Sequence, residues 1–271
     1  MSHTLILRLA GPMQSWGVSS RFGIRETLAE PSKSGVIGLL CAALGWDRAE
    51  ATHVIAGQER TLADLAAMCF GVRVIREGVL RRDYHTAQNV LRASAKLKPG
   101  KPANPGDLQT TVLSERYYLS DAHFLVGFES EDGDLLSALD AALAKPYWPL
   151  FLGRKSFVPT WPVRFELGEG TGPSVMRAPL TTALLTALDP ALMPESIGDR
   201  EQIWSGAAEL SAQTVRLVLD AGTGKAQSPD APGEYIPASR AQRSDVPLSF
   251  APRRFAPREV VTYIRPTLVP D

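Results

Sequence analysis

Residues 4–17 read TLILRLAGPMQSWG and, after a polar connection, residues 30–45 read EPSKSGVIGLLCAALG; these two segments carry the clearest structural signals of the chain. The first segment opens with a short apolar run that ends at a Gly-Pro pair, which is typical of a strand bounded by a turn. In the second segment, Ser32 or Ser34 suits the N-cap of a helix and Gly45 suits its end. The residues therefore predict a strand followed by a helix whose glycines let it lie close against a sheet.

The later segments extend this pattern. We expect a short helix, two strands, a long strand and an amphipathic helix at residues 62–67, 69–77, 79–86, 116–129 and 134–144. The intervening residues 87–112 are rich in proline and glycine and predict an extended arm. Further strand-like segments follow at residues 214–220 and 250–266. The order indicates an α+β fold with a split βαβ, ferredoxin-like (RRM-like) domain.

Composition narrows the functional class. The 271 residues carry 29 basic and 29 acidic side chains, so the formal net charge is zero and a histone-like tail protein is excluded. Two cysteines, Cys41 and Cys69, make neither a disulfide framework nor a zinc motif. The N-terminus has no signal-peptide pattern, and the longest apolar stretch is too short to span a bilayer. We therefore expect a soluble, cytoplasmic protein with no membrane partner.

Charge is nevertheless segregated along the chain. Between Asp83 and Asp107 the chain carries four bases and no acid: Arg92, Lys96, Lys98 and Lys101. Near the C-terminus, residues 239–268 hold six arginines against two acids, whereas residues 129–140 hold five acids and no base. One basic face on a neutral protein suits the binding of a polyanion, although clusters of this size also arise by chance.

Two short motifs could bind phosphate. Lys33 and Ser34 open a helix, whose free N–H groups favour an anion, but the glycine pattern of a nucleotide-binding loop is absent. The alternative for this pair is a plain helix cap with a solvated lysine. The second motif is the tetrapeptide Gly153, Arg154, Lys155 and Ser156, in which glycine allows close backbone approach and two cations supply charge. Basic turns of this kind are also common without any ligand.

Catalytic signals are weaker. His85, Tyr84 and Lys155 could supply the base, acid and cation of a metal-independent ribonuclease, and Tyr84 could stack on a nucleic-acid base. A structural Tyr-His pair on a strand is the simpler interpretation. The four histidines are scattered, so no metal site or cofactor is predicted, and no serine-hydrolase motif is present. Trp16, Tyr117 and Tyr118 are possible stacking platforms, although aromatics beside apolar runs are more often core.

Five sequence blocks, taken in order, go further than any single motif. They are residues 7–17 with 30–40, Arg82 to Thr86, Leu152 to Ser156, and Arg254 to Glu259. Together they strongly resemble the CasD family of the RAMP superfamily, CRISPR-associated proteins of type I-E Cascade. The resemblance is faint between residues 170 and 237.

The resemblance implies an RRM-like domain at residues 1–168 with a β-hairpin thumb at about 87–112, and a smaller β-rich part at residues 169–271. It implies a non-catalytic subunit that caps the 5′ handle of crRNA in antiviral defence, contacts the backbone subunit CasC and the large subunit CasA, and meets target DNA only within the assembled complex. A type I-C relative that cuts repeat RNA keeps the ribonuclease alternative open. The expected RNA-binding residues are Gln14, Ser15, Trp16, Lys33, Ser34, Tyr84, His85, Gly153, Arg154, Lys155, Ser156, Arg253 and Arg254.

Overall fold

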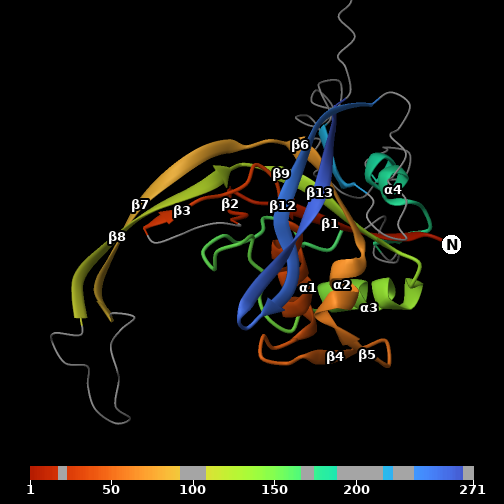
Figure 1. The fold of residues 1–271 in the computed structure, drawn as a ribbon, viewed down its shortest axis with the longest axis horizontal. Coiled ribbons are helices and arrows are strands. Elements are labelled where there is room, and N and C mark those ends of the chain that lie inside the picture. The colour runs from red at the N-terminus through yellow and green to blue at the C-terminus, as the bar shows by residue number, and fades with distance from the viewer. Residues whose placement is uncertain (18–22, 92–107, 166–173, 188–215, 222–234, 265–271) are drawn as a thin grey trace, which may run out of the picture.

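The structure is a computed structural model that describes residues 1–17, 23–91, 108–165, 174–187, 216–221 and 235–264. The predicted arm residues Arg92, Lys96, Lys98 and Lys101 lie outside this description. The fold is a mixed α/β arrangement with one large antiparallel sheet and few helices (Figure 1). No helix in the described ranges is long and apolar enough to cross a membrane.

Seven strands form the main sheet, and every neighbouring pair is antiparallel. Their order is β10 (Val175–Met176), β1 (His3–Ala10), β9 (His123–Ser130), β6 (Cys69–Arg76), β11 (Arg216–Asp220), β13 (Arg253–Ile264) and β12 (Ile236–Phe250). Strands from both ends of the sequence thus share one sheet, which continues across the expected boundary near residue 168.

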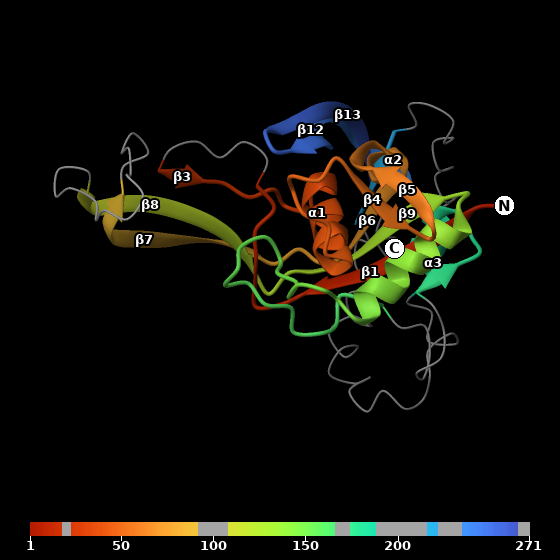
Figure 2. The same cartoon turned by 90° about the horizontal axis from the view of Figure 1, so that it is seen from below.

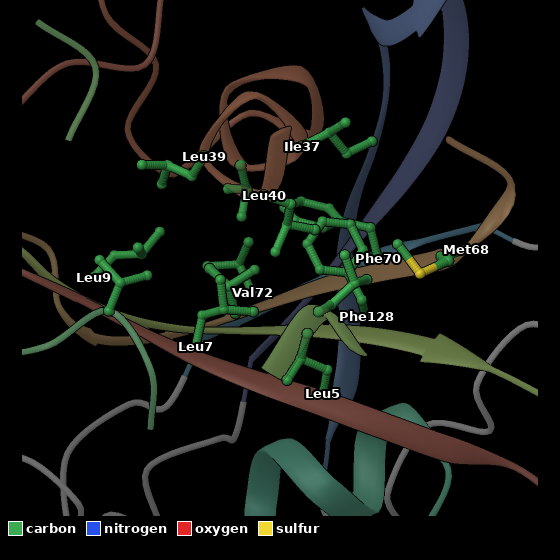
Figure 3. Packing of buried hydrophobic residues seen from close by; sticks show 14 of the residues in the cluster. Leu5, Leu7, Leu9, Ile37, Leu39, Leu40, Met68, Phe70, Val72 and Phe128 are labelled. Carbon is green, nitrogen blue, oxygen red and sulfur yellow. The ribbon is translucent and has the colours of Figure 1, made fainter. Parts of the chain in front are cut away.

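Helices cover both faces of this sheet. On one face lie α1 (Lys33–Leu44), α2 (Leu62–Ala67) and α3 (Gly133–Ala144), and on the other lies α4 (Leu180–Thr186). Side chains alternate along a strand, so Leu5, Leu7 and Leu9 pack toward α1, whereas Ile6 packs toward α4 (Figure 3). The apolar run at the start of the chain is therefore buried on both sides.

Local signals explain how α1 begins and ends. The Ser32 hydroxyl accepts the N–H of Gly35 at 3.3 Å, and Gly45 adopts a left-handed conformation with φ of 74°. This confirms the predicted helix and both of its ends. On the opposite face, Gly71 and Gly127 are register partners, and a Cβ at Gly127 would lie 2.4 Å from Leu180. The two glycines allow α4 to lie directly on the sheet.

A long hairpin leaves the body between β6 and β9. It consists of β7 (Val79–Leu91) and β8 (Leu108–Ser120) and projects away from the helices (Figure 1). The prediction of one strand over residues 116–129 is wrong, because Asp121 adopts a positive φ of 56° and separates β8 from β9. At the root of the hairpin, β2 (Met13–Gln14) and β3 (Ile24–Arg25) pair with β8.

Two further hairpins complete the description. β4 (Thr52–Ile55) and β5 (Gln58–Thr61) form a small two-stranded sheet beyond α1. β12 and β13 form a long hairpin that passes over α1 and α2 (Figure 1). The predicted strand at 214–220 is confirmed as β11, whereas β12 was not expected from the sequence.

Candidate nucleic-acid interface

A groove of about 1280 Å³ runs along α1. Figure 2 shows α1 between the β12/β13 hairpin on one side and the loop after α3 on the other. Residues from both of these walls, from the end of β2 and from the turn after α1 line the groove. The groove therefore joins segments that are far apart in the sequence.

The floor of the groove is the small-residue face of α1. Ser34, Gly38 and Ala42 follow one another at helical spacing and all line the groove. A Cβ built at Gly38 would meet no atom within 4 Å, so this face is open. The small side chains at these three positions let a ligand approach the helix backbone closely.

The glycine turn after α3 forms one wall. Gly153 has φ of 102°, and a Cβ there would lie 2.0 Å from the carbonyl oxygen of Ser15, so only glycine fits. Ser15 N–H donates to the carbonyl of Leu152 at 3.0 Å, which docks the turn on the chain after β2. Arg154 donates to the carbonyl of Tyr117 at 2.8 Å, and its pKa is lowered, first because of burial and then because Arg116 lies nearby.

The tip of the β12/β13 hairpin forms the opposite wall. It contributes Leu248, Ser249, Phe250, Arg253 and Phe255. Neighbouring residues on a strand point to opposite faces, so Arg253 lines the groove while the equally exposed Arg254 does not.

The groove combines positive charge with aromatic surface. Its basic residues are Arg25, Arg48, Arg154, Lys155 and Arg253, and its acidic residues are Glu26, Asp47 and Glu50. Trp148, Phe250 and Phe255 add aromatic rings to the lining. Cations beside aromatic rings are the combination that single-stranded nucleic acids require, because phosphates and base faces are both satisfied.

The groove brings together many of the residues singled out from the sequence. These are Ser15, Trp16, Ser34, Gly153, Arg154, Lys155 and Arg253. Trp16 is only 2% exposed, and its ring packs against the start of α1, where a Cβ at Gly35 would come within 3.0 Å of it. Trp16 therefore supports the groove from below rather than offering a free stacking face.

Lys33 does not behave as expected. Its side chain is buried, and its ammonium donates to the carbonyl of Met68 at 2.7 Å and to Asp220 at 3.0 Å. Its backbone N–H donates to Asp245 from β12 at 2.8 Å. A protein carboxylate thus occupies the end of α1 where a phosphate was expected, and the Lys33 ammonium is bound inside the protein.

Gln14 also turns inward. It is completely buried, and its side-chain amide donates to the carbonyls of Leu9 at 3.1 Å and Ala122 at 2.7 Å. Its carbonyl oxygen accepts the indole N–H of Trp16 at 3.2 Å. With its side-chain hydrogen-bonding groups used inside the protein, Gln14 holds the chain after β1 in place.

The remaining predicted residues lie outside the groove lining. Tyr84 and His85 sit on β7 of the projecting hairpin, Tyr84 with 60% of its surface exposed. Ser156 and Arg254 are exposed beside the groove without lining it. Of the three residues considered for RNA cleavage, only Lys155 reaches the groove. The described residues contain no cluster of metal-ligating side chains.

The charge runs seen in the sequence are largely consumed by ion pairs. Arg258 is buried and binds Asp245 and Asp220, Arg243 pairs with Glu30, and Arg240 pairs with Glu259 at 3.0 Å. In the acidic run, Asp140 binds Arg164 at 2.8 Å and Asp132 caps α3. Of the described arginines in the C-terminal run, Arg253 and Arg254 stay exposed and outside these ion pairs. The groove adds Arg25 and Arg48, which sequence reasoning missed. Arg48 follows the glycine that ends α1, and this position was the available signal.

These features define an α/β protein with a cationic, aromatic groove suited to single-stranded nucleic acid. Comparisons with known proteins agree with this class. Residues 4–261 match the family described as CRISPR-associated protein (Cas_Cas5). The CRISPR system Cascade subunit CasD of Escherichia coli (strain K12) is 35% identical over 180 residues, which cover 64% of this chain and 75% of that protein.

Two solved structures resemble the chain over nearly its whole length. One, described as "CRISPR RNA-guided surveillance complex", has a TM-score of 0.62 and 29% identity and covers 99% of this chain and 93% of the other. The other, described as "Crystal structure of Cas protein", has a TM-score of 0.55 and 33% identity and covers 97% and 95%. The chain belongs to the CRISPR-associated Cas5 family, and the predicted resemblance to CasD is confirmed.

Proposed function

We propose that this chain is a non-catalytic subunit of a type I-E Cascade surveillance complex that binds and caps the 5′ handle of crRNA in the cytoplasm. Its family membership and its likeness to a chain of an RNA-guided surveillance complex support this proposal. The observation that carries it is the groove, in which cations and aromatic rings face a floor of small residues on α1.

In this proposal, the exposed cations Lys155, Arg253 and Arg48 contact handle phosphates from three sides of the groove. Handle bases leave the stacked form and lie against Trp148 and the rings of the hairpin tip, because single-stranded RNA is read through stacking and exposed base edges. The small-residue face of α1 leaves room for the sugar–phosphate chain.

The architecture also supports the proposed bridging role. The order β10-β1-β9-β6, with α1 and α3 on one face, agrees with a ferredoxin-like unit. We place the β7/β8 hairpin, as the thumb, against the backbone subunit CasC, and a separate body surface against the large subunit CasA. Target DNA is met only within the assembled complex.

A binding assay with the full-length protein tests the groove. We expect salt-sensitive binding of a repeat-derived 5′-handle RNA. Lys155→Ala should weaken this binding and lower the slope of log affinity against log salt by about one, because one phosphate contact is lost. Lys145→Ala is the matched control, since Lys145 is exposed just after α3 and does not line the groove. Equal salt slopes for Lys155→Ala and Lys145→Ala would show that Lys155 does not contact the RNA.

The same preparation tests the absence of catalysis. End-labelled CRISPR repeat RNA is incubated with the protein in chelator, beside His85→Ala. We expect binding without cleavage. A single cut that disappears in His85→Ala would overturn the capping role and identify a processing ribonuclease.

A further inference from the structure

A second group of cations lies on the α4 face of the main sheet, opposite the groove. Arg8 on β1, His123 on β9 and Arg76 on β6 occupy neighbouring strands. His123 is the register partner of Ala10 and also of Arg76, and Arg8 lies two residues before Ala10 on the same face. The three side chains therefore share one face, at the end of the sheet from which the β7/β8 hairpin departs.

Arg8 has no carboxylate partner among the described residues. Its guanidinium stacks on the ring of Phe165 at 4.9 Å, and its buried Nε makes no hydrogen bond. Burial lowers the pKa of Arg8, and no acid of the described residues acts against this effect. An unpaired, largely buried guanidinium is costly, because the charge has lost water without gaining a counter-ion.

His123 lies in the same positive field. Its buried Nε2 has no hydrogen-bond partner. Burial, followed by the charges of Arg8 and Arg76, lowers the pKa of His123 from 6.5 to about 3. Arg76 is exposed and donates from Nε to the carbonyl of Asp121, which leaves the rest of its guanidinium facing solvent. Arg76 is thus the member of the cluster that a ligand in solvent can reach.

Other buried cations of this protein contrast with this cluster. Lys33 binds Asp220, Arg258 binds Asp245 and Asp220, and Arg164 binds Asp140. Arg73 is buried without a carboxylate from the described residues, but its guanidinium donates to the carbonyls of Leu184 at 3.0 Å and Leu185 at 2.9 Å. Each of these other buried cations is therefore bound by a carboxylate or by carbonyl oxygens of the chain. At Arg8 the described residues supply no carboxylate. The Nε atom of Arg8 and the Nε2 atom of His123 make no hydrogen bond.

We propose that Arg8, Arg76 and His123 form a second anion site, which binds a phosphate group of a nucleic-acid backbone on the α4 face at the root of the β7/β8 hairpin. Arginine forks match phosphate oxygens, and a neutral imidazole adds an N–H donor. That the phosphate belongs to RNA rests on the proposed function. The nucleic-acid track then continues from the groove past the root of the hairpin.

The anion site is tested on the full-length protein without RNA. Imidazole ¹⁵N shifts of His123 at pH 5 report its protonation while inorganic pyrophosphate is added. We expect a neutral ring that becomes protonated as pyrophosphate binds, because the anion offsets the repulsion from the arginines. Arg76→Gln should weaken this response several-fold, whereas Arg177→Gln, at an exposed arginine outside the cluster, should not.

No change at His123 up to high pyrophosphate concentration would overturn the site. A response to an aspartate-rich peptide but not to pyrophosphate would overturn the phosphate assignment and indicate a protein carboxylate. Arg76 is exposed, so its replacement should leave folding intact. The test therefore needs no substitution of the buried Arg8, which could unfold the protein.

RNA binding separates this inference from the groove. Arg76→Gln should lower the salt slope of handle RNA binding by about one, as Lys155→Ala does. A lower salt slope in Lys155→Ala but not in Arg76→Gln would show that the second site does not contact RNA. The proposed RNA contact in the groove would be unaffected. If the wild-type protein binds no RNA, the proposed function fails, and the pyrophosphate titration still decides the anion site.

Discussion

The two long hairpins of this protein have the same secondary structure, but one packs on the body and the other projects from it. The β12/β13 hairpin lies over α1 and is fastened by buried charges. The β7/β8 hairpin projects, and the contacts that its described residues make with the body lie near its root. The difference lies in where each hairpin places its polar groups.

Asp245 is the centre of the β12/β13 attachment. It is completely buried, accepts Nε of Arg258 at 2.6 Å and accepts the backbone N–H of Lys33 at 2.8 Å. Arg258 also binds Asp220 of β11 and stacks on Phe70 at 5.1 Å. One carboxylate therefore joins the hairpin to the start of α1 and places the hairpin tip beside the groove.

The β7/β8 hairpin has a lighter attachment. Tyr118 packs on Phe157 with ring centroids 5.8 Å apart, and Arg154 donates to the carbonyl of Tyr117. Further out, Tyr84 and Leu113 expose 60% and 49% of their surfaces. A hairpin with exposed apolar side chains and a fixed root is suited to docking on another molecule. The comparison thus separates a hairpin that builds a site from one that reaches a partner.

The largest expected effect is at Asp245. Asp245→Ala leaves Arg258 buried without its main counter-ion, so we expect a loss of about 3–5 kcal/mol in the free energy of unfolding, measured by urea denaturation at neutral pH. Glu259→Gln is the control, because Glu259 pairs with Arg240 at the surface, and should cost at most about 1 kcal/mol. Equal losses of unfolding free energy in Asp245→Ala and Glu259→Gln would show that the buried carboxylate does not fasten the β12/β13 hairpin.

A smaller effect of the same origin appears with pH. Burial by itself raises the pKa of Asp245, but hydrogen bonds and charge from Arg258 outweigh it, and the pKa falls below its ordinary value of 3.8. A depressed carboxyl pKa stabilises the fold above 3.8, and this contribution is lost as the pH falls further. The difference in unfolding free energy between wild type and Asp245→Ala should therefore narrow below that pH. A constant difference from pH 6 to pH 2.5 would contradict the assignment.

The smallest effect on stability is expected in the projecting hairpin. The double change Tyr84→Ser and Leu113→Ser should alter the free energy of unfolding by less than about 0.5 kcal/mol, because both side chains are already in water. It should instead weaken joining to the backbone subunit, measured by co-elution with that subunit and crRNA. Val54→Ser on β4, where Val54 is 66% exposed, is the control. Unchanged co-elution would remove this hairpin from the interface.

Elements with local signals were predictable from the sequence. The apolar run of β1, the serine cap and glycine end of α1, and the periodic α3 each carry their own pattern. β12 was missed because Pro237 and Pro247 and many exposed polar residues interrupt any strand pattern. Its pairing with β13 and its contacts with the helices, rather than its own residues, make it a strand.

In the candidate site too, residues with a local signal were predictable and residues with distant partners were not. The glycine turn at Gly153 was recognisable, because a glycine before two cations is a local signal for a close approach and a charge. Lys33 looked equally suited to phosphate, yet its partner at the helix terminus is a carboxylate 212 residues further along the chain. No local pattern reveals that an anion from the protein itself already fills the position.

The class of this protein could be recognised from its residues alone, because ordered motifs and alternating apolar residues act over short distances along the chain. Only the tertiary structure decided which charges remain available, because ion pairs such as Arg258 with Asp245 and Lys33 with Asp220 form between strands and helices that meet in space. The same packing that buries those cations leaves Lys155 and Arg253 facing the groove and Arg8 without a carboxylate from the described residues. The cost of burying an unpaired charge is what separates the structural residues from those left to bind a ligand.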